Sequence, residues 1–148
     1  MLVVVVEVEN KSIIIITGCG PQENWDESRR LSFFIALEAE IVKTEIAGIH
    51  VILEMDANSK LDKEYIPKDP HAISPNGRVL AAIIERHALV GANGSEKCVG
   101  ATTRIRSTTK RTEKSCIDIM MFSSDLKKHF LSLYIDEERR HVLSPNQD

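Results

Sequence analysis

Two runs of consecutive β-branched residues near the start of the chain constrain the fold more than any other feature. They are Val3 to Val6 and Ile13 to Ile16, and they lie within the longer apolar segments 2–8 and 12–17. β-Branched side chains favour strands, and the polar residues 9–11 between the segments predict a hairpin with a short turn. Because each run is apolar on both faces, we expect both strands to be covered on both sides. An uncovered strand of this kind would be an aggregation hazard.

A helix and a further strand are expected after the hairpin. Asn24 precedes Glu27 by three residues, which is the spacing of a helix N-cap with a reciprocating carboxylate, and Gly48 marks the end of the helix. The apolar positions of this helix repeat with a period near 3.6 and form one stripe: Leu31, Phe34, Ile35, Leu37, Ile41, Val42 and Ile46. Residues 49–53 are again β-branched and aliphatic, so the order strand, helix, strand predicts a parallel crossover.

A second helix is expected to begin with Ser74 as its N-cap and Pro75 at its first helical position. A charged, proline-bearing loop precedes it, and strands are expected again after residue 101. The pattern therefore predicts an α/β fold, with a mixed β-sheet of about six strands and two flanking helices on one side of it.

Two polar residues, Asp56 and Asn58, follow the strand at residues 49–53. Side chains two residues apart point the same way on an extended chain, so the carboxylate and the amide are expected to share one face. The carboxylate can hold a water molecule or a divalent cation, and the amide can donate to an anionic oxygen. The alternative is that both residues only end the strand, because Asp and Asn are common in turns.

A basic stretch follows residue 101, where two strands joined by a loop are expected. The chain has a formal net charge of −3, so any attraction for phosphate must come from a local patch. Five cations face the single acid Glu113 here: Arg104, Arg106, Lys110, Arg111 and Lys114. The alternative is a solvated hairpin tip with no partner. In the second of these strands Asp118 lies between two isoleucines, where a carboxylate needs a hydrogen-bond partner or a cation.

The length of 148 residues allows one domain or part of one. The three cysteines are odd in number, lie far apart and form no Cys-x-x-Cys pair, which argues against a disulfide framework and against a structural zinc site. We therefore expect a reducing, intracellular setting, nuclear or cytoplasmic. The apolar start is too short to span a bilayer, and Glu7 and Glu9 follow it at once, so no membrane span or signal peptide is expected.

Short motifs stand in a fixed order along the chain: Gly-Cys-Gly-Pro-Gln (18–22), Asp-Ala-Asn (56–58), Asn-Gly-Arg (76–78), Thr-Thr-Arg (102–104) and Ser-Cys-Ile-Asp (115–118). By their order and spacing they resemble the endonuclease/exonuclease/phosphatase superfamily, and most closely the endonuclease domains that accompany reverse transcriptases in mobile elements. The resemblance extends over nearly the whole chain. It implies that the chain forms part of a four-layer αββα sandwich.

The resemblance also implies roles for individual residues. Asp56 would orient or activate the attacking water and hold Mg²⁺ or Mn²⁺, Asn58 would hydrogen-bond the scissile phosphate, and Asp118 would orient a histidine. The residues implied to bind phosphate are Thr103, Arg104, Arg106 and Asn76. The implied partner is nucleic acid, namely DNA, and the implied reaction is metal-dependent phosphodiester cleavage.

The sequence departs from the family pattern in several places. Residues 1–148 match a partial domain, without the N-terminal half that supplies a metal-binding Glu and without the final Ser-Asp-His segment that supplies the base. Met55 replaces the usual Gly before Asp56, Cys19 replaces a Tyr, and Asp62 stands where a Gly often follows. We therefore expect a weakly held metal ion and little or no cleavage by the chain alone.

Three functions compete on this basis. The first is an endonuclease-type phosphodiesterase fragment, and the second is a non-catalytic half-domain that serves as an interaction or scaffold unit. The third is a phosphomonoesterase acting on a lipid or sugar phosphate, although the basic stretch favours nucleic acid. Either a homo-oligomer or assembly with the remainder of the domain is expected, and no membrane partner.

Overall fold

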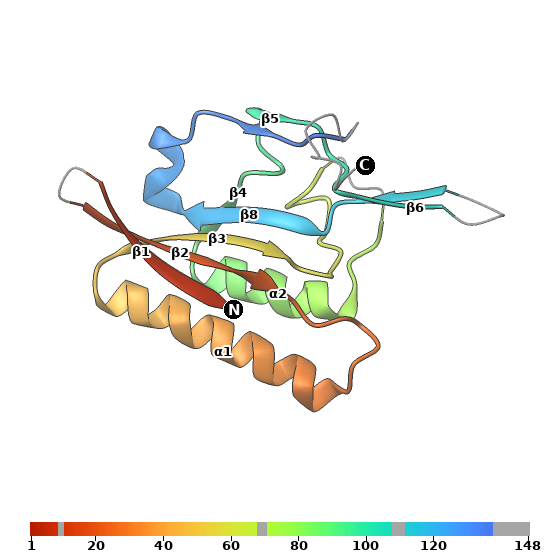
Figure 1. Cartoon of the computed structure of the whole chain (residues 1–148), viewed down its shortest axis with the longest axis horizontal. Coiled ribbons are helices and arrows are strands. Elements are labelled where there is room, and N and C mark those ends of the chain that lie inside the picture. Colours follow the sequence, from red (N-terminus) through yellow and green to blue (C-terminus); the bar gives the residue numbers. More distant parts are fainter. Residues whose placement is uncertain (9–10, 68–70, 108–111, 138–148) are drawn as a thin grey trace, which may run out of the picture.

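A five-stranded mixed sheet forms the centre of the molecule (Figure 1). The computed structural model describes residues 1–8, 11–67, 71–107 and 112–137, with the backbone alone for residues 106 and 107. In spatial order the strands are β1 (Leu2–Val8), β2 (Lys11–Cys19), β3 (His50–Asp56), β8 (Asp118–Ser123) and β4 (Leu89–Gly91). Only β2 and β3 pair in parallel, and the other neighbours pair antiparallel. The predicted fold class, a mixed sheet with flanking helices, is confirmed.

Three smaller elements complete the described strands. A two-stranded parallel sheet joins β5 (Cys98–Val99) to β9 (Leu133–Tyr134), and the 3₁₀ helix η1 (Ser124–His129) follows β8. The predicted basic hairpin consists of β6 (Arg104–Ser107) and β7 (Thr112–Ser115), which pair antiparallel. This hairpin projects from the body of the molecule at the end where β3 finishes and β8 begins (Figure 1).

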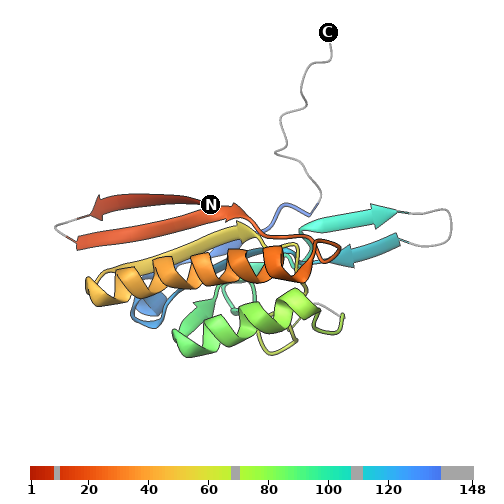
Figure 2. The same cartoon turned by 90° about the horizontal axis from the view of Figure 1, so that it is seen from below.

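Both helices lie on one side of the central sheet, as predicted (Figure 2). They are α1 (Glu27–Ile46) and α2 (Pro75–Arg86). Ser74 caps α2 as expected, since its hydroxyl accepts a hydrogen bond from the amide of Gly77 at 3.1 Å. The predicted cap of α1 is wrong. Asp26, rather than Asn24, accepts from the amide of Arg29 at 2.9 Å, because the loop extends two residues further.

The core lies between the helices and the sheet face that they cover. From the sheet come residues such as Ile16, Leu53 and Met121, each no more than 1% exposed. From α1 come Phe34, Leu37 and Ile41, which are only part of the predicted stripe. The remaining members are exposed: Leu31, Ile35, Val42 and Ile46. A period of 3.6 places all seven on one half of the helix, but a single flat sheet can cover only a narrower arc.

The expectation that the first two strands are covered on both sides is wrong: in β2 only Ile16 is buried, and β1 is less covered still. This strand lies at the edge of the sheet, next to β2 alone, and six of its seven residues are exposed. The helices pack beneath β2, β3 and β8, and they reach β1 too little to bury it. Among the described residues, no helix is long and apolar enough to cross a membrane.

Candidate functional site

The antiparallel pairing of β3 and β8 brings two predicted catalytic residues together. Asp56 is the last residue of β3 and Asp118 the first of β8, and they are direct partners across the ladder. Directly opposite residues point to the same face of a sheet, and here it is the face away from the helices, because the alternate residues Met55 and Ile119 belong to the core. Both carboxylates line a hollow of about 230 Å³. Its other lining residues include Glu54, Asn93 and Thr103.

The pKa of Asp118 is raised above its ordinary value of 3.8. The main cause is partial burial of the carboxyl group, and the negative charge of Asp56 acts in the same direction. A hydrogen bond from the Thr103 hydroxyl opposes the shift. The same Thr103 oxygen accepts from the backbone amides of Ile117 and Asp118 at 2.9 and 3.0 Å, so Thr103 fixes the start of β8.

Asp56, Ala57 and Asn58 form a tight turn and do not continue the strand. The amide of Asn58 donates to Asp56 Oδ1 at 3.0 Å, and Asn58 has a φ of +46°, in the left-handed region that Asn tolerates. The side-chain amide of Asn58 therefore points to the end of β2, where it donates to the carbonyl of Gly20 at 3.1 Å and to Cys19 Sγ at 3.2 Å. The prediction assumed an extended backbone at Asn58, which the structure does not have, but both side chains meet at Cys19 Sγ, which lies 3.2 Å from the Asn58 amide and 3.8 Å from Asp56 Oδ2.

The residues implied to bind phosphate are spread over three environments. Thr103 lines the hollow, and Arg104 follows it at the exposed start of β6. Arg106 lies in the same strand with only its backbone described, whereas Lys110 and Arg111 lie outside the described residues. Asn76 is only 1% exposed, and its side chain is occupied by Arg30 Nη1 (2.8 Å) and the carbonyl of Pro21 (2.8 Å). The structure therefore brings Thr103 to the carboxylates, leaves Arg104 exposed at the start of β6 and places Asn76 in the support of a loop.

The motif comparison missed Glu54 and Asn93 at the site, and it noted Cys19 only as a departure from the family pattern. Glu54 could have been found, since alternation along β3 places it on the face of Asp56. Asn93 accepts from the amide of Met120 at 2.7 Å and donates to the carbonyl of Asp118 at 3.0 Å, so it clamps β8. Cys19 is exposed, with its thiol 3.8 Å from Asp56 Oδ2. No sequence-local pattern indicates the contact of Cys19 with Asp56, 37 residues away, or that of Asn93 with Asp118, 25 residues away.

The carboxylates define what metal ion the site can take. Among the described residues, no three His, Cys, Asp or Glu side chains converge to hold a metal ion. Asp56 and Asp118 supply two carboxylates, and Mg²⁺ accepts one or two of these while it keeps water or substrate phosphate in the rest of its shell. The donor set therefore fits a loosely held Mg²⁺ or Mn²⁺, and it does not fit a closed structural metal site.

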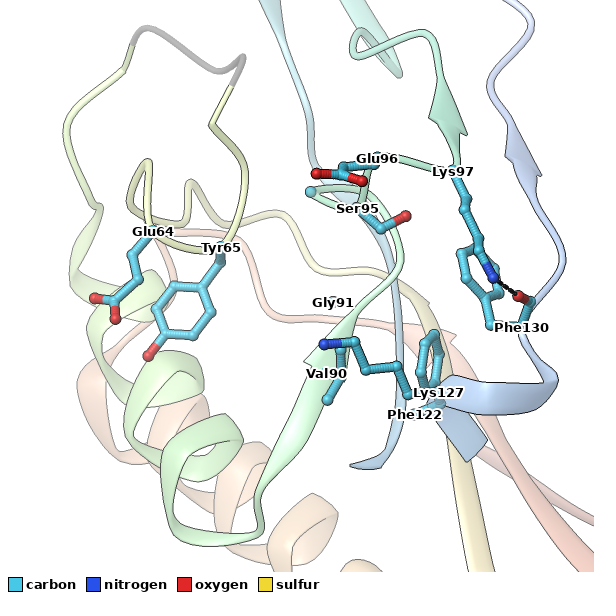
Figure 3. Close-up of a pocket in the computed structure, with 11 residues that line it drawn as sticks. Glu64, Tyr65, Val90, Gly91, Ser95, Glu96, Lys97, Phe122, Lys127 and Phe130 are labelled. Atoms are coloured by element: carbon cyan, nitrogen blue, oxygen red, sulfur yellow. Dashed lines mark hydrogen bonds between the residues drawn. The ribbon is translucent and has the colours of Figure 1, made fainter. Parts of the chain in front are cut away.

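A second hollow, of about 550 Å³, lies beside η1 and β4, the edge strand at the other side of the sheet from β1 (Figure 3). Phe122 and Phe130 stack at its base with ring centroids 5.1 Å apart, and Lys97 Nζ donates to the carbonyl of Phe130 at 2.6 Å. Lys127 extends into it from η1 (Figure 3). None of the predicted site residues lines this hollow, so size alone does not identify the functional site.

The mixed sheet with both helices on one face is compatible with an endonuclease-like α/β fold. Among solved structures, the chain is similar to the endonuclease domain of TRAS1, a telomere-specific non-LTR retrotransposon, with a TM-score of 0.59 at 13% sequence identity. The alignment covers 84% of this chain and 51% of that chain, so this chain spans about half the length of the solved one. The resemblance inferred from the motifs is thus confirmed as a retrotransposon-type endonuclease fold. No protein-family profile matches the sequence, and no curated protein sequence matches it significantly.

Proposed function

We propose that this chain is a nuclease-type phosphodiesterase module that binds DNA and cleaves it weakly when alone. The observation that carries the proposal is the direct pairing of Asp56 with Asp118 at the ends of β3 and β8, on a fold shared with a retrotransposon endonuclease domain. Two carboxylates in one hollow beside a basic hairpin suit a phosphodiester better than an uncharged substrate.

Each residue has a chemical task in this proposal. Asp56 accepts hydrogen bonds from the attacking water and orients it, and together with Asp118 it offers oxygen ligands to a divalent ion. Such an ion, when bound, neutralises the charge on the phosphate oxygens. Arg104, exposed beside Thr103, contacts the DNA backbone and sets the position of the scissile bond.

The slow cleavage that we expect follows from the residues that line the hollow. Among the described residues that line it there is no histidine, so Asp118 has no imidazole to orient there. Catalytic groups that act as a unit are far from additive, so loss of one removes most of the rate. The same observation favours a second candidate, a module that binds DNA without cleaving it.

A plasmid-nicking assay with Mg²⁺ or Mn²⁺ tests the catalytic part. We expect slow nicking by the wild-type chain, lost in Asp56→Ala and retained in Asp62→Ala, which removes an exposed carboxylate outside the hollow. Robust nicking that Asp56→Ala abolishes would show that the chain is fully competent and that the predicted weakness is wrong. Binding without any nicking would leave the non-catalytic module as the function.

Salt dependence of DNA binding tests the basic hairpin. The acid of the hairpin, Glu113, is already paired with Lys60 at 2.6 Å, while Arg104 and Lys114 are exposed. The logarithm of affinity should fall with the logarithm of salt concentration by roughly 0.9 per phosphate contacted. Arg104→Ala and Lys114→Ala should each reduce the size of this slope by roughly 0.9, the value for one phosphate contact. Lys63 is exposed in another loop, so Lys63→Ala should leave the slope unchanged. A salt-insensitive affinity would contradict the proposal.

A further inference from the structure

Helix α1 carries a second apolar stripe on the side that is turned away from the sheet. Its members are exposed: Leu31 (41%), Ile35 (67%), Val42 (37%) and Ile46 (82%). At about 100° per residue, these four side chains lie within an arc of about 60°, which is centred roughly 130° from the buried side chains of the same helix. We call this set the outer stripe. Single exposed apolar residues are ordinary, but a contiguous set marks an interaction site.

The outer stripe is symmetric about its midpoint. The spacing from Leu31 to Ile35 equals that from Val42 to Ile46, and the midpoint lies halfway between Ile35 and Val42. An antiparallel copy of the helix, centred on that point, places Leu31 opposite Ile46 and Ile35 opposite Val42. Every apolar position then meets an apolar position of the other copy. This is the self-complementarity that a two-fold interface requires.

The charge at the midpoint of the outer stripe is already compensated within one chain. Glu38 lies there, beside the exposed Ala39. The carboxylate of Glu38 forms an ion pair with Arg86 of α2, and it also lies 3.1 Å from Nε2 of His87. Two copies therefore bring no unpaired carboxylates together at the axis, and the small side chain of Ala39 allows the two helices to approach closely.

We propose that the outer stripe is a homodimer interface, in which the α1 helices of two copies pack antiparallel across a two-fold axis. This direction sets the positive N-terminal end of each helix beside the negative C-terminal end of the other, whereas parallel helices would bring like ends together. The helices lie on one side of the sheet (Figure 2), and the hollow of Asp56 and Asp118 lies on the other side, so the hollow stays open in both copies. The dimer goes beyond the proposed function and does not depend on it.

The length of α1 limits the strength of this dimer. The helix has 20 residues, which at about 1.5 Å per residue make it about 30 Å long, and a strip about 10 Å wide along it gives a footprint of roughly 300 Å² on each copy. This is at the small end of protein interfaces, so we expect a weak dimer that dissociates in the upper micromolar range. Sedimentation velocity of the full chain, from about 1 µM to about 1 mM, measures this equilibrium directly.

Two adjacent residues of α1 supply matched variants. Ile35→Lys places a charge within the outer stripe and should weaken the dimer at least about tenfold. Ala36 is also exposed but lies about 100° further round the helix, so Ala36→Lys adds the same charge beside the stripe and should weaken the dimer less than about threefold. Circular dichroism checks that each variant is folded. Equal weakening by the two variants, or no weakening by Ile35→Lys, would overturn the outer stripe as the interface.

New charges at the two ends of the stripe test the antiparallel direction. Leu31→Lys and Ile46→Glu should each weaken the dimer, and the double variant should recover most of the lost affinity, because each new lysine then faces the new glutamate of the other copy. Within one chain the two positions are about 22 Å apart along the helix, so the recovery cannot come from a contact inside a single copy. A double variant no tighter than either single variant would overturn the antiparallel direction. A wild-type chain that remains monomeric throughout would overturn the dimer itself, whatever the nicking assay shows.

Discussion

The two faces of the central sheet differ in what their residues do. On the helix side, alternate residues such as Ile16, Leu53 and Ile119 are at most 2% exposed and form the core. The residues next to them in sequence point to the other side. They include Ile15, which is half-buried, and the paired carboxylates Asp56 and Asp118. The strands are the same, so the difference comes only from the alternation of side chains and from what covers each face.

This difference separates stability from chemistry within one set of strands. The helix side is close-packed, so changes of even one methylene there are felt. The other side tolerates polar and charged groups because it is not sealed, and its carboxylates gather where the strands end. Adjacent positions on a strand face opposite sides of the sheet. A substitution at one of them should therefore affect mainly stability, and at the other mainly binding or catalysis.

The largest expected effect comes from truncation on the helix side. Ile16→Ala removes a side chain that is 1% exposed, and it should cost about 2–5 kcal/mol of unfolding free energy through lost burial and the cavity left behind. Ile15→Ala, one residue away and half-buried on the face away from the helices, should cost clearly less. Urea unfolding of both variants measures the difference. Equal losses would show that the face away from the helices is as well packed as the core.

Much of this arrangement could be predicted from the sequence. The hairpin, both helices and the strand into Asp56 follow from β-branched runs, a period of 3.6 and the Ser74–Pro75 start signal, all of which act over a few residues. The family resemblance implied a shared site for Asp56 and Asp118, whereas their direct pairing across β3 and β8 was not predicted.

Other features depend on contacts that sequence patterns do not carry. The exposure of β1 is set by how far α1 and α2 extend under the sheet, which the apolar runs themselves cannot report. The side-chain amide of Asn58 donates to the carbonyl of Gly20, which is 38 residues distant in sequence, so no local pattern reports this turn. Asn93 and Cys19 likewise gain their roles only from partners far along the chain.

A smaller effect is expected where the end of β2 contacts the turn after β3. A Cβ at Gly20 would lie 2.6 Å from the carbonyl oxygen of Ala57, and the Gly20 amide donates to the carbonyl of Asp56 at 2.6 Å. Gly20→Ala should therefore cost about 1–3 kcal/mol and reduce nicking, because the turn that holds Asp56 must shift. At Gly91, which lies outside the hollow, the nearest atom to such a Cβ is Met121 Sδ at 3.3 Å, in a flexible side chain. Gly91→Ala is therefore the control, and nicking lost equally in both variants would contradict this account.

The smallest expected effect on the free energy of unfolding is a gain, and it comes from a substitution on the face away from the helices. Partial burial and the charge of Asp56 raise the pKa of Asp118, so the folded protein holds its ionised form less well than the unfolded chain does. At a pH above the raised pKa, the charge on Asp118 lowers the stability of the folded protein. This loss disappears as the pH falls below the raised pKa. Asp118→Asn removes the charge and should therefore stabilise the protein at neutral pH.

The gain should be less than about 1 kcal/mol, since Asp118 is exposed and solvent screens its interaction with the half-buried Asp56. It should fade as the pH is lowered through the raised pKa towards the ordinary value of 3.8, where the wild-type carboxyl is also neutral. The same substitution should reduce any nicking, because one of the two carboxylates is lost. Urea unfolding of wild type and Asp118→Asn at neutral and acidic pH gives the first measurement and the plasmid assay the second. A variant that is less stable at neutral pH would mean that the hydrogen bond from Thr103 outweighs the repulsion, and that this carboxylate supports the fold as the residues of the helix side do.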